Sequence, residues 1–440
     1  MSTDGLDMSD TGATVASTEL VEPRRWYQGR NLVVVIAIAT IAVMSASRLI
    51  ADADRLTSSG TIGLGLRLAI PIALAGIGGL YSERSGTVNI GLEGMLIMGT
   101  IMAGYAGWHW GPVAALFAGA VGGLLAGLLL ALATATFGVN HIVAGFAINI
   151  IAGSNGPGVA RFLANQWFTG EEARAQGGSV SNSPPVDGQF PTVSLPVLSD
   201  GPDLLGDLER KGWFGISDIA GIARGLTFDL RLDTIIAIAL IIGTAYLVWR
   251  TPFGLRLRSA GERPGAADSL GVSVIKMRYY GLMLSGAMTG VGGAVLVFAG
   301  ANRYQQGQTG GQGFLGLAAL VFGNWKPAGV FGGAGVFGYA NGIRLSIDAS
   351  TTVKALILAV GISLALFVVW AMVRRNVRAV VVAGIVAVLA FVVYAVVDEI
   401  NNQFVYMTPY VVTLLVVTLF AQRLRPPAAE GIPYRKGDQL

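Results

Sequence analysis

The feature that most constrains this chain is a succession of apolar segments, each about 18–25 residues long, with almost no charge. Hydrophobic residues make up 53% of the 440 residues and charged residues only 13%, against about 25% charged in soluble proteins. Such segments suit helices that cross the hydrocarbon core of a bilayer. Backbone N–H and C=O groups inside a bilayer must form hydrogen bonds within the protein, which leaves helices or a closed β-barrel. The segments lack the alternation of apolar and polar residues that barrel strands show, so helices are favoured. The sequence therefore predicts an all-α, polytopic membrane helix bundle.

The apolar segments and the basic clusters between them predict about twelve (10–12) crossings, because one short segment, near 312–323, is also compatible with re-entry. By the positive-inside rule, Arg24, Arg25 and Arg30 place the N-terminus in the cytoplasm. Twelve crossings then place every large basic cluster and the C-terminus there, in a protein of the cytoplasmic membrane. The segments lie near 31–50, 61–80, 90–106, 113–137, 139–160, 231–249, 278–299, 312–323, 328–345, 353–372, 379–397 and 404–421.

The same count divides the chain into six regions. A long polar loop is expected outside the cytoplasm, with an amphipathic helix around Asp203–Leu226. It either docks an external partner or is a tolerated surface insertion. The regions are a disordered cytoplasmic tail at 1–30, membrane helices 1–5 at 31–160, the extracytoplasmic loop at 161–230, membrane helices 6–9 at 231–345 with a cytoplasmic loop at 250–277, membrane helices 10–12 at 346–422 with an extra hairpin at 353–398, and a cytoplasmic tail at 423–440.

An internal repeat is visible in two glycine-rich stretches. Asn-Ile-Gly-Leu-Glu-Gly at 89–94 precedes a helix with glycines at 123 and 127, and Gly-Gln-Gly-Phe-Leu-Gly at 311–316 precedes one with glycines at 338 and 342. The two repeats start on opposite sides of the membrane by the count above. Inverted repeats of this kind are typical of transporters, with the substrate path between the halves. The alternative is that glycine-rich helices simply resemble each other in composition.

The most specific cytoplasmic segment is Gly254–Gly271. Pro264 suits the first turn of a helix and Gly271 suits a left-handed C-terminal cap. The two-turn helix between them carries Ala266 and Ala267 and is too short to be stable alone in water. It suits a docking groove on a partner, whereas the alternative is an ordinary basic loop.

Five polar residues lie in or beside apolar segments and are candidates for a substrate pathway: Asn89, Glu93, Asn140, His141 and Asn149. A carboxylate or amide at membrane depth is costly unless it faces a partner group or water. Their alternative role is structural. Glu93 would then pair with an arginine or a helix N-terminus, the amides would join neighbouring helices, and His141 would sit at the membrane interface.

Several chemistries are excluded by what the sequence lacks. It has no cysteine and only two histidines, so we expect no metal site. It has no phosphate-binding loop of the form G-x-x-x-x-G-K-[ST] and no visible nucleophile–base pair, so we expect neither a nucleotide site nor an enzyme. The net charge of +4 is explained by the basic loops of a membrane protein, so no nucleic-acid partner is expected.

Four segments resemble the permease subunits of ABC importers in the branched-chain amino acid, simple-sugar and nucleoside group. They are Ser82–Gly99, Thr251–Gly271, Arg278–Leu296 and Gly311–Pro327, and Met407–Val416 is similar to the family's last helix. The motif E-R-S-G-T-V-N-I-G-L-E-G at 83–94 is most similar to nucleoside-type permeases.

The resemblance implies import of nucleosides, purine nucleosides in particular, through a pair of permease subunits. It implies as partners a cytoplasmic ATPase that uses the ATP and Mg²⁺, a second homologous or identical permease, an external substrate-binding lipoprotein, and the lipid bilayer. Asn89, Glu93 and Asn149 match polar positions of the family's central helices. The open alternatives are import of simple sugars or branched-chain amino acids, and an ATP-independent secondary transporter. ATPase coupling is assigned to Gly261, Glu262, Pro264, Ala266, Ala267 and Gly271.

Overall fold

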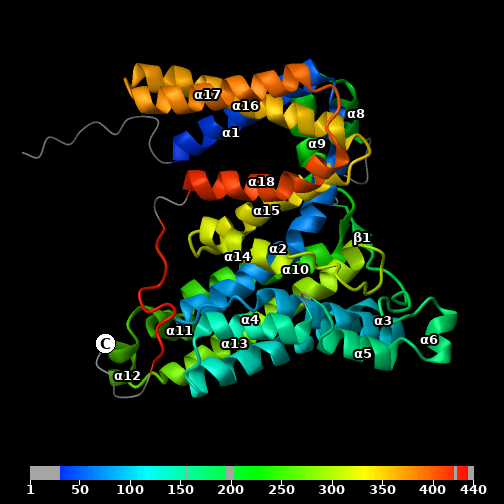
Figure 1. The fold of residues 1–440 in the computed structure, drawn as a ribbon, viewed down its shortest axis with the longest axis vertical. Coiled ribbons are helices and arrows are strands. Elements are labelled where there is room, and N and C mark those ends of the chain that lie inside the picture. Colours follow the sequence, from blue (N-terminus) through cyan, green and yellow to red (C-terminus); the bar gives the residue numbers. More distant parts are fainter. Residues whose placement is uncertain (1–29, 154–155, 195–202, 421–423, 435–440) are drawn as a thin grey trace, which may run out of the picture.

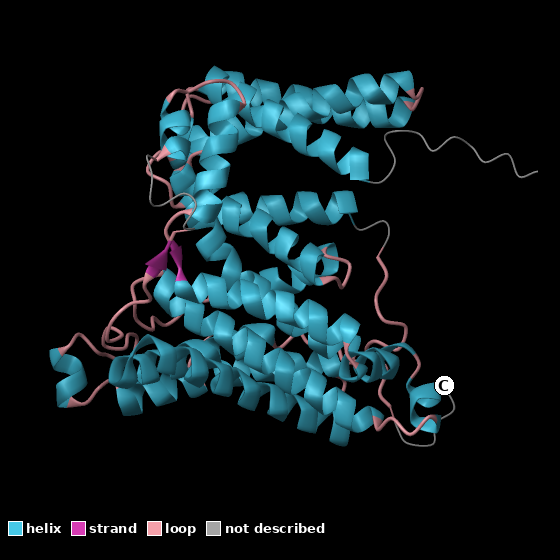
Figure 2. Cartoon of the chain, turned by 180° about the vertical axis from the view of Figure 1, so that it is seen from behind, coloured by secondary structure: helices cyan, strands magenta, loops and turns pink. Residues whose placement is uncertain are grey.

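The computed structural model describes residues 30–153, 156–194, 203–420 and 424–434. The tail expected at 1–30 lies outside this part except for Arg30, as does the last part of the C-terminal tail. Most of the described residues are helical, and the short antiparallel pair of β1 (Thr192–Val193) and β2 (Leu230–Arg231) is the one sheet among them (Figure 2). The all-α prediction is confirmed.

Helices coincide with every predicted apolar segment, but the number of crossings is not confirmed as twelve. Within the described residues, seven helices are long and apolar enough to cross a membrane. The predicted segment 139–160 is divided between α4 (His141–Ala152) and α5 (Val159–Trp167), and 312–323 forms only the 11-residue α14 (Gln312–Phe322). The remaining predicted segments correspond to helices of 18 residues or more, not all of which are among those seven. They are α1 (Arg30–Ala51), α2 (Ser59–Arg84), α3 (Leu92–Ala131), α10 (Leu232–Arg250), α13 (Val274–Ala299), α15 (Pro327–Arg344), α16 (Ala349–Val373), α17 (Val377–Val396) and α18 (Asn402–Phe420).

The long helices run side by side, and the short elements gather at the two ends of the bundle (Figure 1). One end, called here the α12 end, carries α11 (Pro252–Glu262) and α12 (Pro264–Ser269). The opposite α9 end carries α8 (Leu204–Arg210), α9 (Ile216–Thr227) and, further to the side, α6 (Glu171–Ala175). The amphipathic helix expected at Asp203–Leu226 is thus two helices, because the glycines at 212 and 215 adopt positive φ between them.

Glycines bring the central helices into close contact. α3 folds back on itself at Gly111, whose φ is +81° and which precedes Pro112, so this 40-residue helix makes two antiparallel passages. Its second passage packs on α13, where a Cβ added to Gly123 would overlap the carbonyl oxygen of Gly286. In the same way Gly338 of α15 lies against the Gly65 carbonyl of α2. The two glycine pairs noted in the sequence are therefore helix-packing positions.

The arrangement matches the predicted inverted repeat. The starts of α3 and α14 meet, because a Cβ on Gly313 would lie 2.5 Å from the Cα of Glu93. From there α3 runs toward the α9 end, while α14 runs toward the α12 end, where Arg84 donates to the Trp325 carbonyl after it. The return helices then cross over, since the second passage of α3 packs on α13 and α15 packs on α2.

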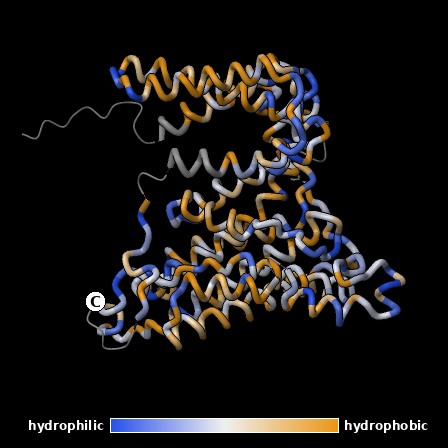
Figure 3. The backbone as a smooth tube through the Cα atoms, in the orientation of Figure 1, coloured by the Kyte–Doolittle hydropathy of each residue, from blue (hydrophilic) through white to orange (hydrophobic). Residues whose placement is uncertain are grey.

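The two lateral edges of the bundle differ in character. At one edge, α16 and α17 form the predicted extra hairpin, which packs beside α1 and is strongly apolar along its length (Figure 3). At the other edge lie α4, α5 and α13 (Figure 1). Between α4 and α5 the helix is interrupted at Gly153, whose φ is +104°.

Candidate translocation and coupling sites

Glu93 caps the N-terminus of the half-length helix α14. Its two carboxylate oxygens accept hydrogen bonds from the backbone N–H groups of Gly311, at 3.1 Å, and Gly313, at 2.7 Å. The side chain is buried, and a carboxylate at this position is favoured by the unpaired N–H groups and the helix dipole. Of the two roles weighed for Glu93, this geometry supports the structural one, pairing with a helix N-terminus.

Asn149 and Asn89 hold the turn that precedes α3. The Asn149 Oδ1 accepts from the Gly94 N–H at 2.7 Å, and its Nδ2 donates to the Ile90 carbonyl at 3.0 Å. The Asn89 Oδ1 accepts from the Gly91 N–H at 2.9 Å, and its Nδ2 donates to the Ser285 hydroxyl of α13 at 2.8 Å. The structure thus brings three of the five predicted pathway residues to one junction, where each is hydrogen-bonded within the chain.

Asn140 and His141 lie away from this junction, at the start of α4. The Asn140 side chain accepts from the N–H groups of Ile142 and Val143 and is the N-cap of the helix. His141 is buried, and neither ring nitrogen has a hydrogen-bond partner in the described part of the chain. The neighbouring Thr136–Tyr279 hydroxyl contact joins the chain before α4 to the first turns of α13, which places this pair toward the α12 end.

A small hollow beside the junction holds polar groups that the sequence analysis did not single out. It encloses about 30 Å³ among the α4–α5 interruption, Thr100 of α3, Arg161 of α5 and the loop 305–309. Ligand pockets usually enclose about 300 Å³ or more, so this hollow is too small to hold a ligand in this conformation. Among the lining residues, the buried Nε2 of Gln308 lacks a hydrogen-bond partner within the described residues. The buried Oε1 of Gln312, in the first turn of α14 and outside the lining of the hollow, also lacks one there. They are amide groups of the kind that could bind the polar edge of a ligand.

The predicted coupling helix is present as α12. Pro264 occupies its first turn, and Gly271 follows it with φ at +81°. Its two alanines face opposite ways, since Ala266 is exposed whereas Ala267 is 3% exposed and packs in the main apolar core. Leu270 is 84% exposed. The surface open to a partner therefore includes Ala266 and Leu270 but not Ala267.

Gly261 and Glu262 lie against the loop that follows α2. A Cβ added to Gly261 would overlap the Arg84 carbonyl oxygen, so only glycine fits this approach. The Glu262 carboxylate lies 3.3 Å from the Arg84 guanidinium. α11 thus contacts the end of α2 and the turn at 85–91, which leads to the junction at Glu93.

A segment after α18, residues 424–434 and called here the C-terminal strap, also binds this region. Its backbone N–H groups at Ala429 and Gly431 donate to the carbonyls of Gly261 and Gly86, at 2.9 and 3.1 Å. Arg278, which is buried, donates to the Ile432 carbonyl at 2.9 Å. The strap therefore ties together α2, α11 and α13. Sequence reasoning missed it because the segment has neither an apolar run nor a motif.

The strap carries a carboxyl with a perturbed acidity. Burial raises the pKa of Glu430, and the nearby Arg84 charge and a hydrogen bond with Glu83 oppose the rise only in part. The Glu83 carboxylate also accepts a hydrogen bond from the Trp325 indole at 2.5 Å. A protonatable group thus lies beside the contacts that hold the strap.

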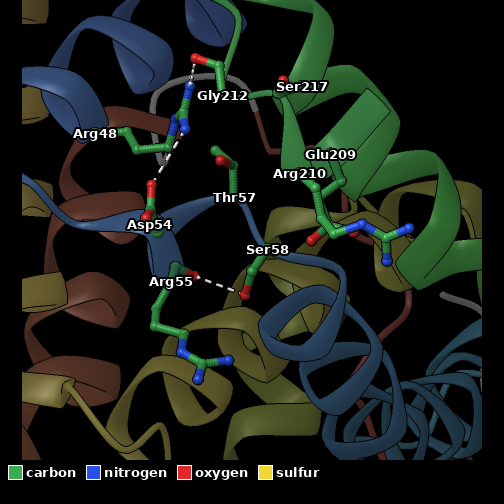
Figure 4. A pocket seen from close by; sticks show the side chains of 9 residues that line it. All are labelled: Arg48, Asp54, Arg55, Thr57, Ser58, Glu209, Arg210, Gly212 and Ser217. Atoms are coloured by element: carbon green, nitrogen blue, oxygen red, sulfur yellow. Dashed lines mark hydrogen bonds and ion pairs between the residues drawn. The ribbon is translucent and has the colours of Figure 1, made fainter. Parts of the chain in front are cut away.

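A charged hollow lies at the α9 end, between the start of α2 and the α8–α9 pair (Figure 4). It encloses about 210 Å³. Arg48 at its edge bridges Asp54, at 3.2 Å, the Gly212 carbonyl, at 3.1 Å, and Asp218, at 3.0 Å. The 161–230 region is therefore fastened to the bundle by a buried ion pair, Arg48–Asp218, and by the hydrogen bond from Arg48 to the Gly212 carbonyl. The lining residues are Arg48, Asp54, Arg55, Thr57, Ser58, Glu209, Arg210, Gly212 and Ser217.

Comparison with protein families identifies the bundle. The family described as the permease component of branched-chain amino acid transport systems matches residues 61–358, which include the junction, α12 and the repeat. The chain belongs to this permease family. No solved structure matches it.

Relatives within the family bear descriptions that name cargo. The chain is 32% identical to the guanosine ABC transporter permease protein NupQ of Bacillus subtilis, over 84% of its own length and 94% of that protein's. It is 30% identical to the nucleoside ABC transporter permease protein NupC of Lactococcus lactis, over 83% and 93%. It is also 24% identical to a second Bacillus subtilis guanosine permease protein, NupP, over 61% and 69%.

Proposed function

We propose that this chain is the membrane permease of an ABC importer for nucleosides, with purine nucleosides as the preferred cargo. The observation that carries the proposal is the match to NupQ and NupC over nearly their whole length, at 32% and 30% identity. The motif at 83–94 supports it, since it forms the turn and helix start at the junction. The chain itself would perform no chemistry.

ATP hydrolysis is assigned to a separate cytoplasmic ATPase that docks on α12. The exposed Ala266 and Leu270 offer a small apolar surface on a helix that is bound to the rest of the bundle at Gly261 and Glu262. The α12 end then faces the cytoplasm, together with the basic turn between α16 and α17. ATP binding and hydrolysis would shift the bundle between outward-open and inward-open populations.

The remaining partners are a second permease and an external binding lipoprotein. Two different Bacillus subtilis chains that resemble this one carry the same guanosine permease description, so we assign the second permease to a homologous chain. The binding lipoprotein is assigned to the α9 end, where α8 and α9 present the charged hollow.

Uptake of labelled guanosine by vesicles that contain the complete complex tests the cargo. We expect ATP-dependent accumulation that unlabelled adenosine competes with and that ribose and leucine do not affect. Uptake of a labelled sugar or branched-chain amino acid without uptake of guanosine would overturn the cargo assignment. Uptake by this chain alone, driven by an ion gradient, would support a secondary transporter instead.

A further inference from the structure

The C-terminal strap lies across a point where three elements of the bundle converge. A Cβ added to Gly86, just after α2, would lie 3.2 Å from the Cα of Gly261 in α11 and 3.3 Å from a guanidinium nitrogen of Arg278 in α13. Gly86 also has a φ of +93°, which side chains rarely tolerate. The strap donates hydrogen bonds to the carbonyls of both glycines and accepts one from the arginine. It therefore fastens the three elements at their closest approach.

The strap also binds both halves of the inverted repeat. On the first half it holds the turn that leads into α3, through its bond to Gly86. On the second half, the Arg425 N–H donates to the Asn324 side-chain oxygen at 2.8 Å, in the loop between α14 and α15. Between these contacts, the Ala428 N–H donates to the Glu262 carboxylate at 3.2 Å, at the end of α11 next to α12. One short segment thus joins both repeats to the helix pair on which we place the ATPase.

The strap lies on the surface of the bundle and is not threaded through it. Residues 424–434 form no helix or strand, and most of their contacts are backbone hydrogen bonds. Their buried side chains are few, namely Pro427, Ala429 and Tyr434, of which the last packs in the main apolar core. Segments with few buried apolar contacts open at a lower free energy than core helices. The strap can therefore leave its site while the helices stay folded.

Opening of the α12 end requires the elements under the strap to separate. Transporters with inverted repeats alternate by rocking one repeat against the other around a fixed site. Because the strap is bonded to both repeats, a movement that separates them at this end breaks some of its bonds. Contacts that exist in one conformation and not in another shift the population toward the first. The hollow beside the junction, about 30 Å³ in volume, is too small for a ligand while the strap is docked.

We propose that the C-terminal strap is a latch, which holds the α12 end closed when it is docked and allows opening when it is released. The latch rests on the proposed function, which places the α12 end in the cytoplasm and the ATPase on α12. The strap also restrains ATP hydrolysis, because it binds Glu262 beside the docking helix and resists the movement that hydrolysis drives. It is an autoinhibitory contact made by the chain's own terminus.

Two proline substitutions release the strap and test the latch. Ala429→Pro removes the N–H that binds α11. Gly431→Pro removes the N–H that binds the turn after α2, and proline cannot adopt the φ of +78° found there. Ile432→Ala is the matched control, because it shortens an exposed side chain and keeps the carbonyl that accepts from α13. Faster hydrogen exchange of residues 424–434 in the double-proline variant verifies release.

Ser285→Cys reports opening of the α12 end, because the chain contains no other cysteine. Ser285 is buried and accepts a hydrogen bond from Asn89 at the junction. The strap contacts α13 at Arg278, about 10 Å nearer the start of that helix, so the cysteine becomes accessible when the helices separate. A membrane-impermeant maleimide is applied to inside-out vesicles that contain the complete complex. ATP hydrolysis without binding protein is measured on the same vesicles.

We expect labelling of the double-proline variant to be about tenfold faster than that of Ile432→Ala, in keeping with the loss of two backbone hydrogen bonds. Its ATP hydrolysis without binding protein should also rise. Equal labelling of the two variants, or slower hydrolysis after release, would overturn the latch. A deletion of residues 424–440 should give the same result as the prolines, so misfolding of one variant leaves the test intact.

The outcomes separate the latch from the proposed function. Faster labelling in right-side-out vesicles instead would place the α12 end outside the cell, against the proposed orientation but in favour of the latch. Neither readout needs cargo, so failed guanosine uptake together with faster labelling would count against the cargo assignment alone.

Discussion

At the scale of single residues, the polar groups of the junction divide into those that hold the fold and those that remain free. Glu93, Asn89 and Asn149 accept hydrogen bonds from backbone N–H groups of the two repeats. Gln312 offers a buried oxygen with no partner within the described residues. A buried polar group without a partner is destabilising, so we expect this oxygen to bind water or a ligand.

Glu93→Gln is expected to destabilise the bundle. A neutral amide retains one acceptor but loses the charge at the start of α14, which is worth about 1–2 kcal/mol in a partly buried site. Thermal unfolding of the purified complex should show a lower midpoint, with losses of expression and uptake in proportion. Unchanged thermal stability with abolished uptake would show that Glu93 acts on the cargo instead.

Gln312→Leu is expected to lower uptake without lowering thermal stability, whereas Glu93→Gln should lower both. It removes an unsatisfied oxygen, so stability should hold or rise, while guanosine uptake falls by about tenfold for a lost polar contact of ~1.5 kcal/mol. Uptake and thermal midpoint are measured on the same preparation. Full uptake in this variant would show that Gln312 does not contact the cargo. Glu93→Gln, which changes the carboxylate that caps the same helix from α3, is the matched comparison.

These contrasts show what the sequence could predict at this scale. The bounds of α12 were predictable because proline and glycine act locally, and Pro264 and Gly271 lie where expected. The partner of Glu93 was not, because the N–H of Gly313 is 220 residues away. The polarity of Asn149 indicated a helix contact, but which backbone it holds depends on how α4 packs on α3.

At the scale of elements, local signals predicted helices well but did not predict every interruption. The segment 139–160 is apolar enough to predict one helix, yet it breaks at Gly153. The turn of α3 at Gly111, by contrast, falls in the gap predicted between the segments 90–106 and 113–137. The C-terminal strap has no periodicity, and only its contacts with Gly86 and Gly261 reveal it.

The two alanines of α12 should respond differently to the same substitution. Ala266→Arg changes an exposed position, so the permease should fold with an unchanged thermal midpoint but lose the copurifying ATPase. Ala267→Arg places a charge in the apolar core, so it should lower expression and the midpoint by disrupting packing. Normal assembly and transport with Ala266→Arg would show that the ATPase docks elsewhere.

Docking of the C-terminal strap should depend on pH through Glu430. Its pKa is raised in the docked state, mainly by burial. The docked strap therefore binds its proton more tightly than the released strap, so docking is favoured at low pH and weakens as pH rises through the raised pKa. Hydrogen exchange of residues 424–434 should quicken from pH 5 to pH 8 beyond the intrinsic rate. Glu430→Gln stays neutral and should reduce that excess, leaving the part due to its hydrogen-bond partner Glu83. An equal excess in both proteins would refute the coupling.

At the scale of the whole molecule, the bundle joins two ends to which we assign different partners. α12 and the strap lie at one end, and the charged hollow of α8 and α9 lies at the other. The junction at Glu93 lies between them, reached from the α12 end through the turn at 85–91. The α2, α3 and α13 core connects the two ends and contains the start of α3 at the junction.

The charged hollow predicts how the external binding protein engages. Arg210 is exposed at its rim and paired with Asp207 nearby, so it is available to an acidic group of a partner without holding the fold. Arg210→Glu should weaken the apparent affinity of the binding protein by up to about fivefold, the equivalent of ~1 kcal/mol for an exposed ion pair. The loss should shrink with added salt, because exposed charges are screened. Titration of binding-protein-stimulated ATP hydrolysis measures the apparent affinity, and saturating binding protein should restore the full rate.

Arg378→Glu, an exposed charge reversal on α17 near the α12 end, is the matched control and should leave the titration unchanged. Equal effects of the two reversals, or a salt-independent loss, would place the binding protein away from α8 and α9.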